Sequence, residues 1–123
     1  MSDVKAKHLD DIPYYSGPNA ITGIKFRTAG RDLGVTAWGM NVLEMDPGCA
    51  GHPEHDHVRD GQEEVYVVMR GGGTLKAGTE ETPLDVGTLV RVGPGQTRKI
   101  LPGPQGIVVL ALGATPGRAY ATR

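Results

Sequence analysis

Apolar and polar residues alternate over much of this chain, in short runs separated by turn-forming residues. The clearest runs are Glu64–Met69 and the stretch from Val35 to Met45, which is rich in β-branched and large apolar residues. Such runs recur at intervals of roughly 8 to 12 residues, which is typical of a β-sandwich or β-barrel. No window shows the 3.6-residue period of an amphipathic helix. The pattern therefore predicts an all-β fold.

The expected strands are bounded by Gly, Pro, Asn and Asp residues. The first expected strand starts with Ile24–Phe26 and ends near Ala29–Asp32. The others are Val35–Met45, His55–Val58, Glu64–Met69, Thr74–Ala77, Thr82–Leu84, Leu89–Val92, Thr97–Leu101 and Ile107–Leu112. The triplet Gly71–Gly73 is expected to form a turn. Residues 1–20 are polar and contain helix-breaking prolines, so we expect an N-terminal segment (1–20) followed by one domain (21–123).

Length and charge narrow the function classes. A chain of 123 residues suits one domain with a real core. With 13 Lys and Arg residues against 14 Asp and Glu residues, the net charge of −1 argues against nucleic-acid binding. No apolar run approaches the roughly 18 residues that span a bilayer, and the N-terminus lacks the apolar core of a signal peptide. We therefore expect a protein that does not bind membranes. Cys49 is the one cysteine, which excludes an intrachain disulfide and fits the reducing cytoplasm, where we expect the protein to be.

The residues best suited to chemistry are gathered in one short stretch. Three of the four histidines, His52, His55 and His57, fall within six positions, and Glu63 and Glu64 follow after a polar loop. Neutral histidine is the commonest protein metal ligand near pH 7. Two histidines and a carboxylate can hold a divalent ion and leave positions open for a substrate. His52 precedes a proline, so its direction cannot be inferred.

Strand parity predicts which of these side chains face one another. If the segment is extended, His55 and His57 point to the same face. If the polar loop that follows is a hairpin turn, the returning strand brings Glu64 beside His57, with Tyr66 on the same face. Glu63 would then point to the opposite face. Two paired strands would thus create a metal site.

At this point the chain resembles the cupin superfamily. His55-Asp56-His57 matches the His-x-His of the first cupin motif, and Glu64, six intervening residues and Gly71 match its Glu-x6-Gly half. The loop between the two halves is longer than usual, and the leading glycine is displaced. The second motif starts at Gly87 and ends at Arg98, which occupies the position of the histidine that is normally the fourth metal ligand. Arginine keeps its proton and cannot donate a lone pair to a metal.

The resemblance implies a double-stranded β-helix, or jelly-roll barrel, with the site in its mouth. It also implies one divalent transition metal (Fe, Mn, Ni or Zn) held by His55, His57 and Glu64. The chain looks most like the small single-domain bacterial cupins, which are often dimeric, so we expect a homodimer.

Two interpretations of Arg98 remain open. In the first, a metal is present and Arg98 grips an anionic substrate beside it, with Tyr66 as a second substrate-binding residue. In the second, Arg98 pairs with Glu64 and replaces the metal. We expect a metal-dependent enzyme, of oxygenase or isomerase type, that acts on a small anionic organic molecule. A non-catalytic binding or sensor barrel, with or without metal, is the alternative. A protein–protein interaction module with a vestigial pocket is the third.

Overall fold

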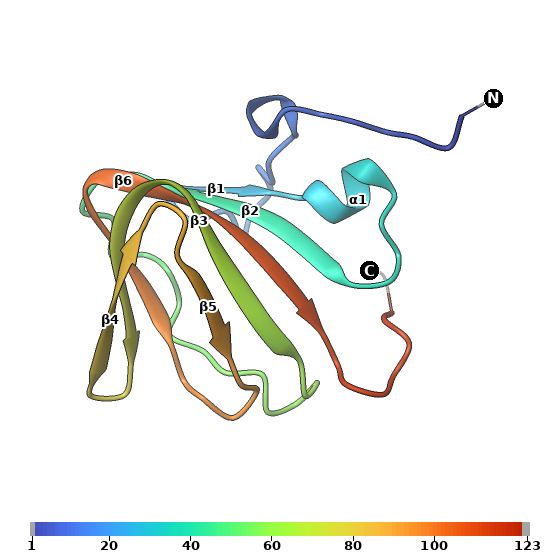
Figure 1. Cartoon of the computed structure of the whole chain (residues 1–123). Helices are drawn as coiled ribbons and strands as arrows, with labels where there is room; N and C mark the ends of the chain where they lie inside the picture. The colour runs from blue at the N-terminus through green and yellow to red at the C-terminus, as the bar shows by residue number, and fades with distance from the viewer. Residues whose placement is uncertain (1, 122–123) are drawn as a thin grey trace.

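The structure, a computed structural model, describes residues 2–121. Strands make up 46% of the chain and helices 7%, which confirms the all-β fold. The elements are β1 (Ile24–Arg27), α1 (Ala29–Leu33), β2 (Gly39–Met45), β3 (Glu63–Ala77), β4 (Glu80–Asp85), β5 (Leu89–Val92) and β6 (Lys99–Ala114), after a short 3-10 turn at Leu9–Asp11 (Figure 1). Among the described residues, no helix is long and apolar enough to cross a membrane.

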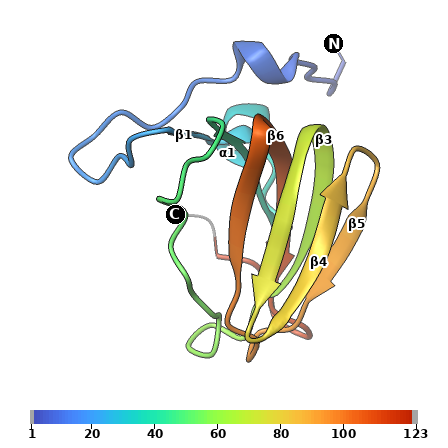
Figure 2. The same ribbon diagram turned by 90° about the vertical axis from the view of Figure 1, so that its left-hand side faces the viewer.

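Two long antiparallel strands, β3 and β6, connect the parts of a single sheet. The strand order is β1-β2-β6-β3-β4, and β5 pairs with the first half of β3 while β4 pairs with its second half. Figure 2 shows β3 and β6 curving side by side, with β4 and β5 beyond β3. The sheet rolls up in the manner of a jelly roll, but its hydrogen bonding does not close into a complete barrel.

The Gly71–Gly73 triplet lies inside β3, so the predicted turn at this position is wrong. Here the register of β3 against β6 shifts, and the two strands approach closely. A Cβ on Gly71 would lie 2.1 Å from the carbonyl oxygen of Gly106, and a Cβ on Gly73 would lie 2.3 Å from that of Leu101. The glycines therefore let one strand bend from one face of the roll to the other without ending.

Three other boundaries differ from the sequence prediction. After β1 the chain forms the one-turn helix α1, because the small residues Ala29 and Gly30 are buried against β2. The strand expected from Val35 begins only at Gly39. The two strands expected at Thr97–Leu101 and Ile107–Leu112 are parts of one strand, β6.

Apolar side chains form two clusters, one on each face of the sheet. The inner cluster fills the roll and contains Leu43, Met45, Tyr66, Val68, Leu75, Leu84, Val92, Ile100, Ile107, Val109 and Ala111. The outer cluster contains Ile12, Ala29, Val42 and Val108, so the N-terminal segment and α1 cover the outside of β2 and β6.

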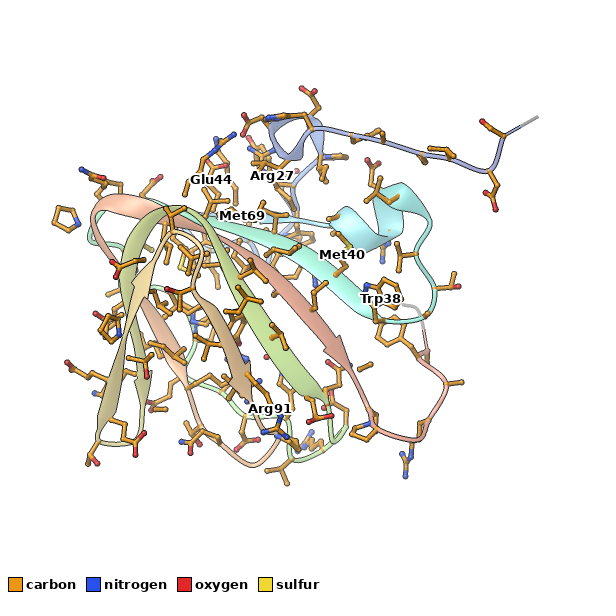
Figure 3. All side chains as sticks on the ribbon, viewed as in Figure 1. Arg27, Trp38, Met40, Glu44, Met69 and Arg91 are labelled. Carbon is orange, nitrogen blue, oxygen red and sulfur yellow. The ribbon has the colours of Figure 1, made fainter. Side chains whose placement is uncertain are left out.

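Arg27 holds the N-terminal segment in place. It donates to the carbonyl oxygen of Ile12 at 2.7 Å and pairs with Glu44 at 3.1 Å (Figure 3). The division of the chain at residue 20 stays a prediction.

Candidate metal and ligand site

The histidine segment pairs with a different part of the chain than predicted. Residues 55–57 form no hairpin with β3. His55 instead forms an isolated bridge with Arg98, through N–H···O bonds of 3.1 and 2.9 Å, and the amide of His57 donates to the carbonyl of Pro94 at 2.8 Å. The first half of β3 pairs with β5 and β6. The first cupin-like motif is therefore tied to the second by backbone hydrogen bonds.

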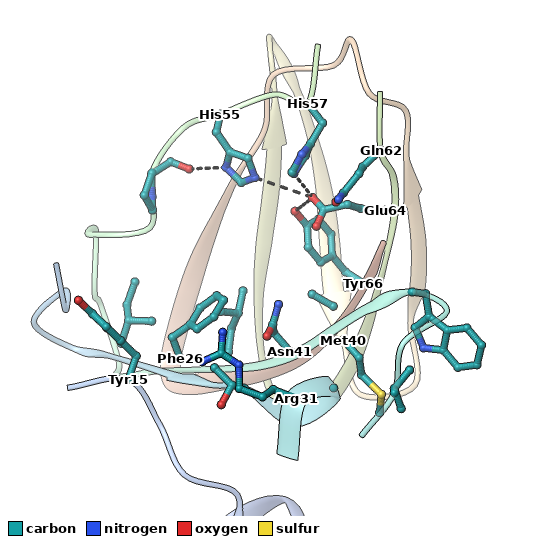
Figure 4. Close-up of a pocket in the computed structure, with 18 of the residues that line it drawn as sticks. Tyr15, Phe26, Arg31, Met40, Asn41, His55, His57, Gln62, Glu64 and Tyr66 are labelled. Carbon is teal, nitrogen blue, oxygen red and sulfur yellow. Dashed lines mark hydrogen bonds and ion pairs between the residues drawn. The ribbon is translucent and has the colours of Figure 1, made fainter. Parts of the chain in front are cut away.

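Despite this different pairing, the predicted ligand set is assembled. The Nε2 atom of His57 lies 3.1 Å from Oε1 of Glu64, and Nε2 of His55 lies 3.8 Å from the same oxygen. One candidate ligand atom from each residue lies within 4.8 Å of the others (Figure 4). Glu63 points away and pairs with Arg91 at 2.9 Å on the surface, as strand parity predicts.

Hydrogen bonds at Nδ1 fix the orientation of the two facing rings. Nδ1 of His55 lies 2.9 Å from the carbonyl oxygen of Pro53, which can only accept, so this nitrogen carries a proton. Nδ1 of His57 lies 3.1 Å from the carboxylate of Asp60. A neutral ring with a proton on Nδ1 has its lone pair on Nε2. Both Nε2 atoms face Glu64: in a protonated ring Nε2 donates to its carboxylate, and in a neutral ring with the proton on Nδ1 the lone pair of Nε2 is available to an ion.

His52 has the opposite tautomer. The buried amide of Ile100 donates to Nδ1 of His52 at 2.9 Å, so in the neutral ring the proton is on Nε2. Burial, reinforced by the neighbouring His55, lowers the pKa of His52 to about 4, and the ring is neutral at pH 7. His52 therefore anchors its segment to β6 and presents no lone pair to the cluster.

Glu64 is a partly buried carboxylate with several partners. Arg98 and the hydroxyl of Tyr66, at 2.9 Å, both donate to its Oε1 atom. Burial alone would raise the pKa of Glu64, but the hydrogen bonds from His55, Arg98 and Tyr66 outweigh burial and lower it to about 2. Burial and the nearby Glu64 charge raise the pKa of Tyr66, so its hydroxyl stays protonated and acts as a donor.

Arg98 points into the protein behind Glu64. Its side chain is fully buried and also donates to the carbonyl oxygens of Gln96 at 2.9 Å and Gly93 at 3.4 Å. Arg98 does not line the cavity in front of Glu64. In this arrangement its guanidinium positions Glu64 and holds the turn of the second motif. Direct contact with a substrate would require Arg98 to leave these partners.

A cavity of about 1110 Å³ opens in front of the cluster. Tyr66, which the sequence analysis proposed as a ligand contact, lines it, and so does Gln62. Gln62, Asp60 and the aromatic lining residues other than Tyr66 were not predicted from the sequence. Asp60 follows His57 by three residues, and this spacing was an available signal. No pattern in the sequence connects the aromatic lining residues, since they come from distant segments.

Comparisons with solved structures place the fold. A sugar phosphate isomerase of a cupin superfamily from Silicibacter pomeroyi is 21% identical over 91% of this chain and 77% of its own, with a TM-score of 0.75. A cupin protein from Bacteroides fragilis is 20% identical over 89% of this chain and 91% of its own, with a TM-score of 0.66. A protein from Thermotoga maritima, described as a predicted oxalate decarboxylase, is 17% identical over 90% of this chain and 99% of its own, with a TM-score of 0.69.

A scan against models of protein families finds no match, and a search of curated proteins finds none. The likeness to these solved structures therefore lies in the fold. On this structural ground, the chain has the cupin fold.

Proposed function

We propose that this protein is a metal-dependent enzyme acting on a small anionic organic molecule, with His55, His57 and Glu64 holding one divalent transition metal. The observation that carries the proposal is the orientation of the two rings. Nδ1 of His55 lies on the carbonyl oxygen of Pro53 and Nδ1 of His57 on the carboxylate of Asp60, so that Nε2 of both rings faces Glu64 and can lose its proton to bind an ion. Metal-binding histidines are usually oriented in this way by an acceptor at the second nitrogen.

The spacing of the donor atoms fits an ion. Bonds of about 2.1 Å to ligands at right-angled or tetrahedral positions put neighbouring ligand atoms roughly 3.0 to 3.4 Å apart. The distances from Glu64 Oε1 to the Nε2 atoms of His57 and His55, 3.1 and 3.8 Å, are close to this range. A divalent ion bound there would supply a Lewis acid that polarises a substrate oxygen.

Charge is the argument for an anionic substrate. Arg98 already neutralises Glu64, so a divalent ion bound beside this pair leaves an excess of positive charge in a half-buried site. An anionic ligand would offset that excess. Two structural neighbours have names that refer to anionic compounds: one is a sugar phosphate isomerase and the other a predicted oxalate decarboxylase.

The cavity residues have separate roles in this proposal. Tyr66 keeps its proton and donates to Glu64, which fixes the carboxylate that faces the histidines. His52 stays neutral and holds its segment on β6. Gln62 lines the cavity next to Glu64 and offers an amide to a substrate oxygen (Figure 4).

A second candidate is a metal-free binding barrel. Its supporting observation is that Oε1 of Glu64 already accepts from both Arg98 and Tyr66. In that case the Arg98–Glu64 pair replaces the ion. Arg98→His separates the two candidates, because it restores a fourth ligand. The metal-dependent protein should then bind its ion more tightly, whereas a metal-free barrel should gain an ion that the parent does not bind.

Metal analysis tests the proposal. The protein, as purified and after incubation with Fe²⁺, Mn²⁺, Ni²⁺ or Zn²⁺, should retain about one ion per chain, measured by elemental analysis after desalting. His55→Ala should lose the ion, and His52→Asn, the matched control on the same segment, should keep it because Oδ1 of Asn can still accept from the amide of Ile100. Turnover by the metal-loaded protein that His55→Ala abolishes would separate an enzyme from a sensor. Absence of any retained ion in the parent protein would reject the metal-dependent function.

We also propose that the chain forms a homodimer. Met69 on β3 and Leu89 on β5 are exposed apolar residues on the outside of the roll, and a partner could cover them. Sedimentation at micromolar concentration that shows only the 13.0 kDa monomer would contradict this.

A further inference from the structure

The aromatic side chains of this protein are concentrated around one cavity. The chain has one Phe, one Trp and four Tyr residues, and all of these except Tyr14 line the cavity in front of the histidine cluster. Trp38 is 45% exposed and Phe26 is 40% exposed. Large aromatic side chains normally dominate the core of a domain. Here the one Phe and the one Trp are instead left at a cavity wall, where a ligand can cover them.

The aromatic residues form the end of the cavity opposite the histidines. In Figure 4, Tyr15, Phe26 and Met40 lie across the cavity from His55 and His57. These residues reach the cavity from separate parts of the chain: the N-terminal segment, β1 and β2. The histidine end is therefore rich in charged and hydrogen-bonding groups, whereas at the other end Tyr15 and Phe26 lie side by side, and the amide of Tyr15 donates to the carbonyl oxygen of Phe26 at 2.8 Å.

The size of the cavity argues against a very small ligand. Ligand pockets are commonly about 300 to 1,000 Å³, and this one is about 1110 Å³. An anion of a few atoms held at His55, His57 and Glu64 would leave the aromatic wall exposed to water. A ligand that spans the cavity would bury Tyr15 and Phe26 as well.

We propose that the cavity binds a ring-bearing organic acid, with its carboxylate at the histidine end and its aromatic ring against Tyr15 and Phe26. The position of the carboxylate rests on the proposed function, whereas the position of the ring rests only on the aromatic wall. Offset or edge-to-face contacts between rings suit this wall.

A sugar ring is a poorer match for the same wall. Its hydroxyl groups need several donors and acceptors when they are buried. Away from the histidines, the polar side chains of the lining are Asn19, Thr28, Arg31, Thr36 and Asn41. An aromatic ring needs no such partners, and a cation beside it is favourable to its face.

Trp38 is the only tryptophan and lines the same cavity, so its fluorescence reports on whether the cavity is occupied. The test is a titration of the metal-loaded protein with 3-phenylpropionate, with propionate as the acid that lacks a ring. 3-Phenylpropionate should give a saturable blue shift and bind at least about tenfold more tightly than propionate, as expected from an added ring contact. Phe26→Ala should weaken 3-phenylpropionate about tenfold and leave propionate unchanged. Tyr14→Ala, which removes the one aromatic residue outside the cavity, should change neither.

Three results would overturn the inference. The first is equal binding of the two acids, and the second is tighter binding of glucose 6-phosphate than of 3-phenylpropionate. The third is a blue shift of Trp38 fluorescence that grows with protein concentration in the absence of ligand, because a second copy of the chain would then cover the cavity. Metal retention is measured on the same samples and must be unaffected by Phe26→Ala. If the protein retains its metal but does not prefer the acid with a ring, this inference alone is rejected. If the protein prefers the acid with a ring but retains no metal, the proposed function alone is rejected.

Discussion

The two halves of the candidate site are held in different ways. Glu64 lies in the interior of the sheet, where its strand is paired with Val92 on one side and Gly113 on the other. His55 and His57 lie in a segment without regular strand structure, attached by backbone bonds to Arg98 and Pro94. The carboxylate is therefore fixed by the fold, whereas the positions of the two histidines depend on a few local contacts. Ligand binding should therefore stabilise the histidine segment more than the strand.

We expect the largest effect on stability from replacing Arg98, the partner of the firmly held carboxylate Glu64. Glu64 and Glu63 are neighbours, but Glu64 pairs with a fully buried arginine, and Glu63 pairs with Arg91, whose side chain is 63% exposed. Removing one partner of a buried pair leaves an uncompensated charge. Arg98→Met should lower the free energy of unfolding by about 3 to 5 kcal/mol, and Arg91→Met by about 1 kcal/mol or less.

Urea denaturation of the metal-free protein at neutral pH measures both variants. The interpretation of Arg98 as a positioning residue fails if the two variants lose the same stability. It also fails if Arg98→Met changes ligand binding without changing stability.

The second expected effect is acid destabilisation through His52. Its pKa is about 4 in the folded protein and 6.5 in an ordinary setting. Between these values the unfolded chain binds a proton that the folded protein excludes, so stability falls as the pH falls from 6.5 to about 4. The loss should approach about 3 kcal/mol. The lowered pKa of Glu64 adds a further loss below 4.5, whereas the raised pKa of His55 acts in the opposite direction.

His52→Asn is the matched control, since its Oδ1 can accept from the amide of Ile100 but does not titrate. This variant should have a flatter profile between pH 6.5 and 4 than the parent. Equal slopes would assign the acid sensitivity to other groups.

The same contrast between halves explains what the sequence could predict. Period-two alternation places Glu64 and Tyr66 on one face and Glu63 on the other, and the Tyr66–Glu64 and Arg91–Glu63 hydrogen bonds agree. Alternation describes a continuous strand, and the predicted hairpin at His57 failed because the chain there follows no strand geometry.

Long-range packing accounts for the other differences. The pairing of His55 with Arg98 joins residues far apart in the sequence, and periodicity carries no information about such a pairing. Gly71 was expected to turn the chain because a glycine triplet usually does. Its role depends instead on the carbonyl of Gly106, which passes too close for any side chain. The motif spacing alone pointed to Arg98, but not to its burial behind Glu64.

We expect the smallest effect from replacing Asp60, the partner of His57 in the loosely held histidine segment. Its carboxylate accepts from Nδ1 of His57 at 3.1 Å. Partners of this kind typically contribute 10- to 100-fold to metal affinity. Asp60→Asn keeps an oxygen that can accept but removes the charge, so we expect metal affinity to fall by about tenfold. Isothermal titration with Zn²⁺ measures this, with Asp56→Asn, an exposed neighbour, as the control. Equal affinities for the two variants would remove Asp60 from the site.

The most direct test of the account is to locate the ion. Crystals grown with Mn²⁺ or Zn²⁺, measured at the metal absorption edge, should show one anomalous peak per chain at about 2.0 to 2.2 Å from Nε2 of His55, Nε2 of His57 and a carboxylate oxygen of Glu64. His52 should lie outside the coordination sphere, with its bond to Ile100 retained. An anomalous map without a peak at this position, with Arg98 and Glu64 still paired, would contradict the account and establish the metal-free barrel.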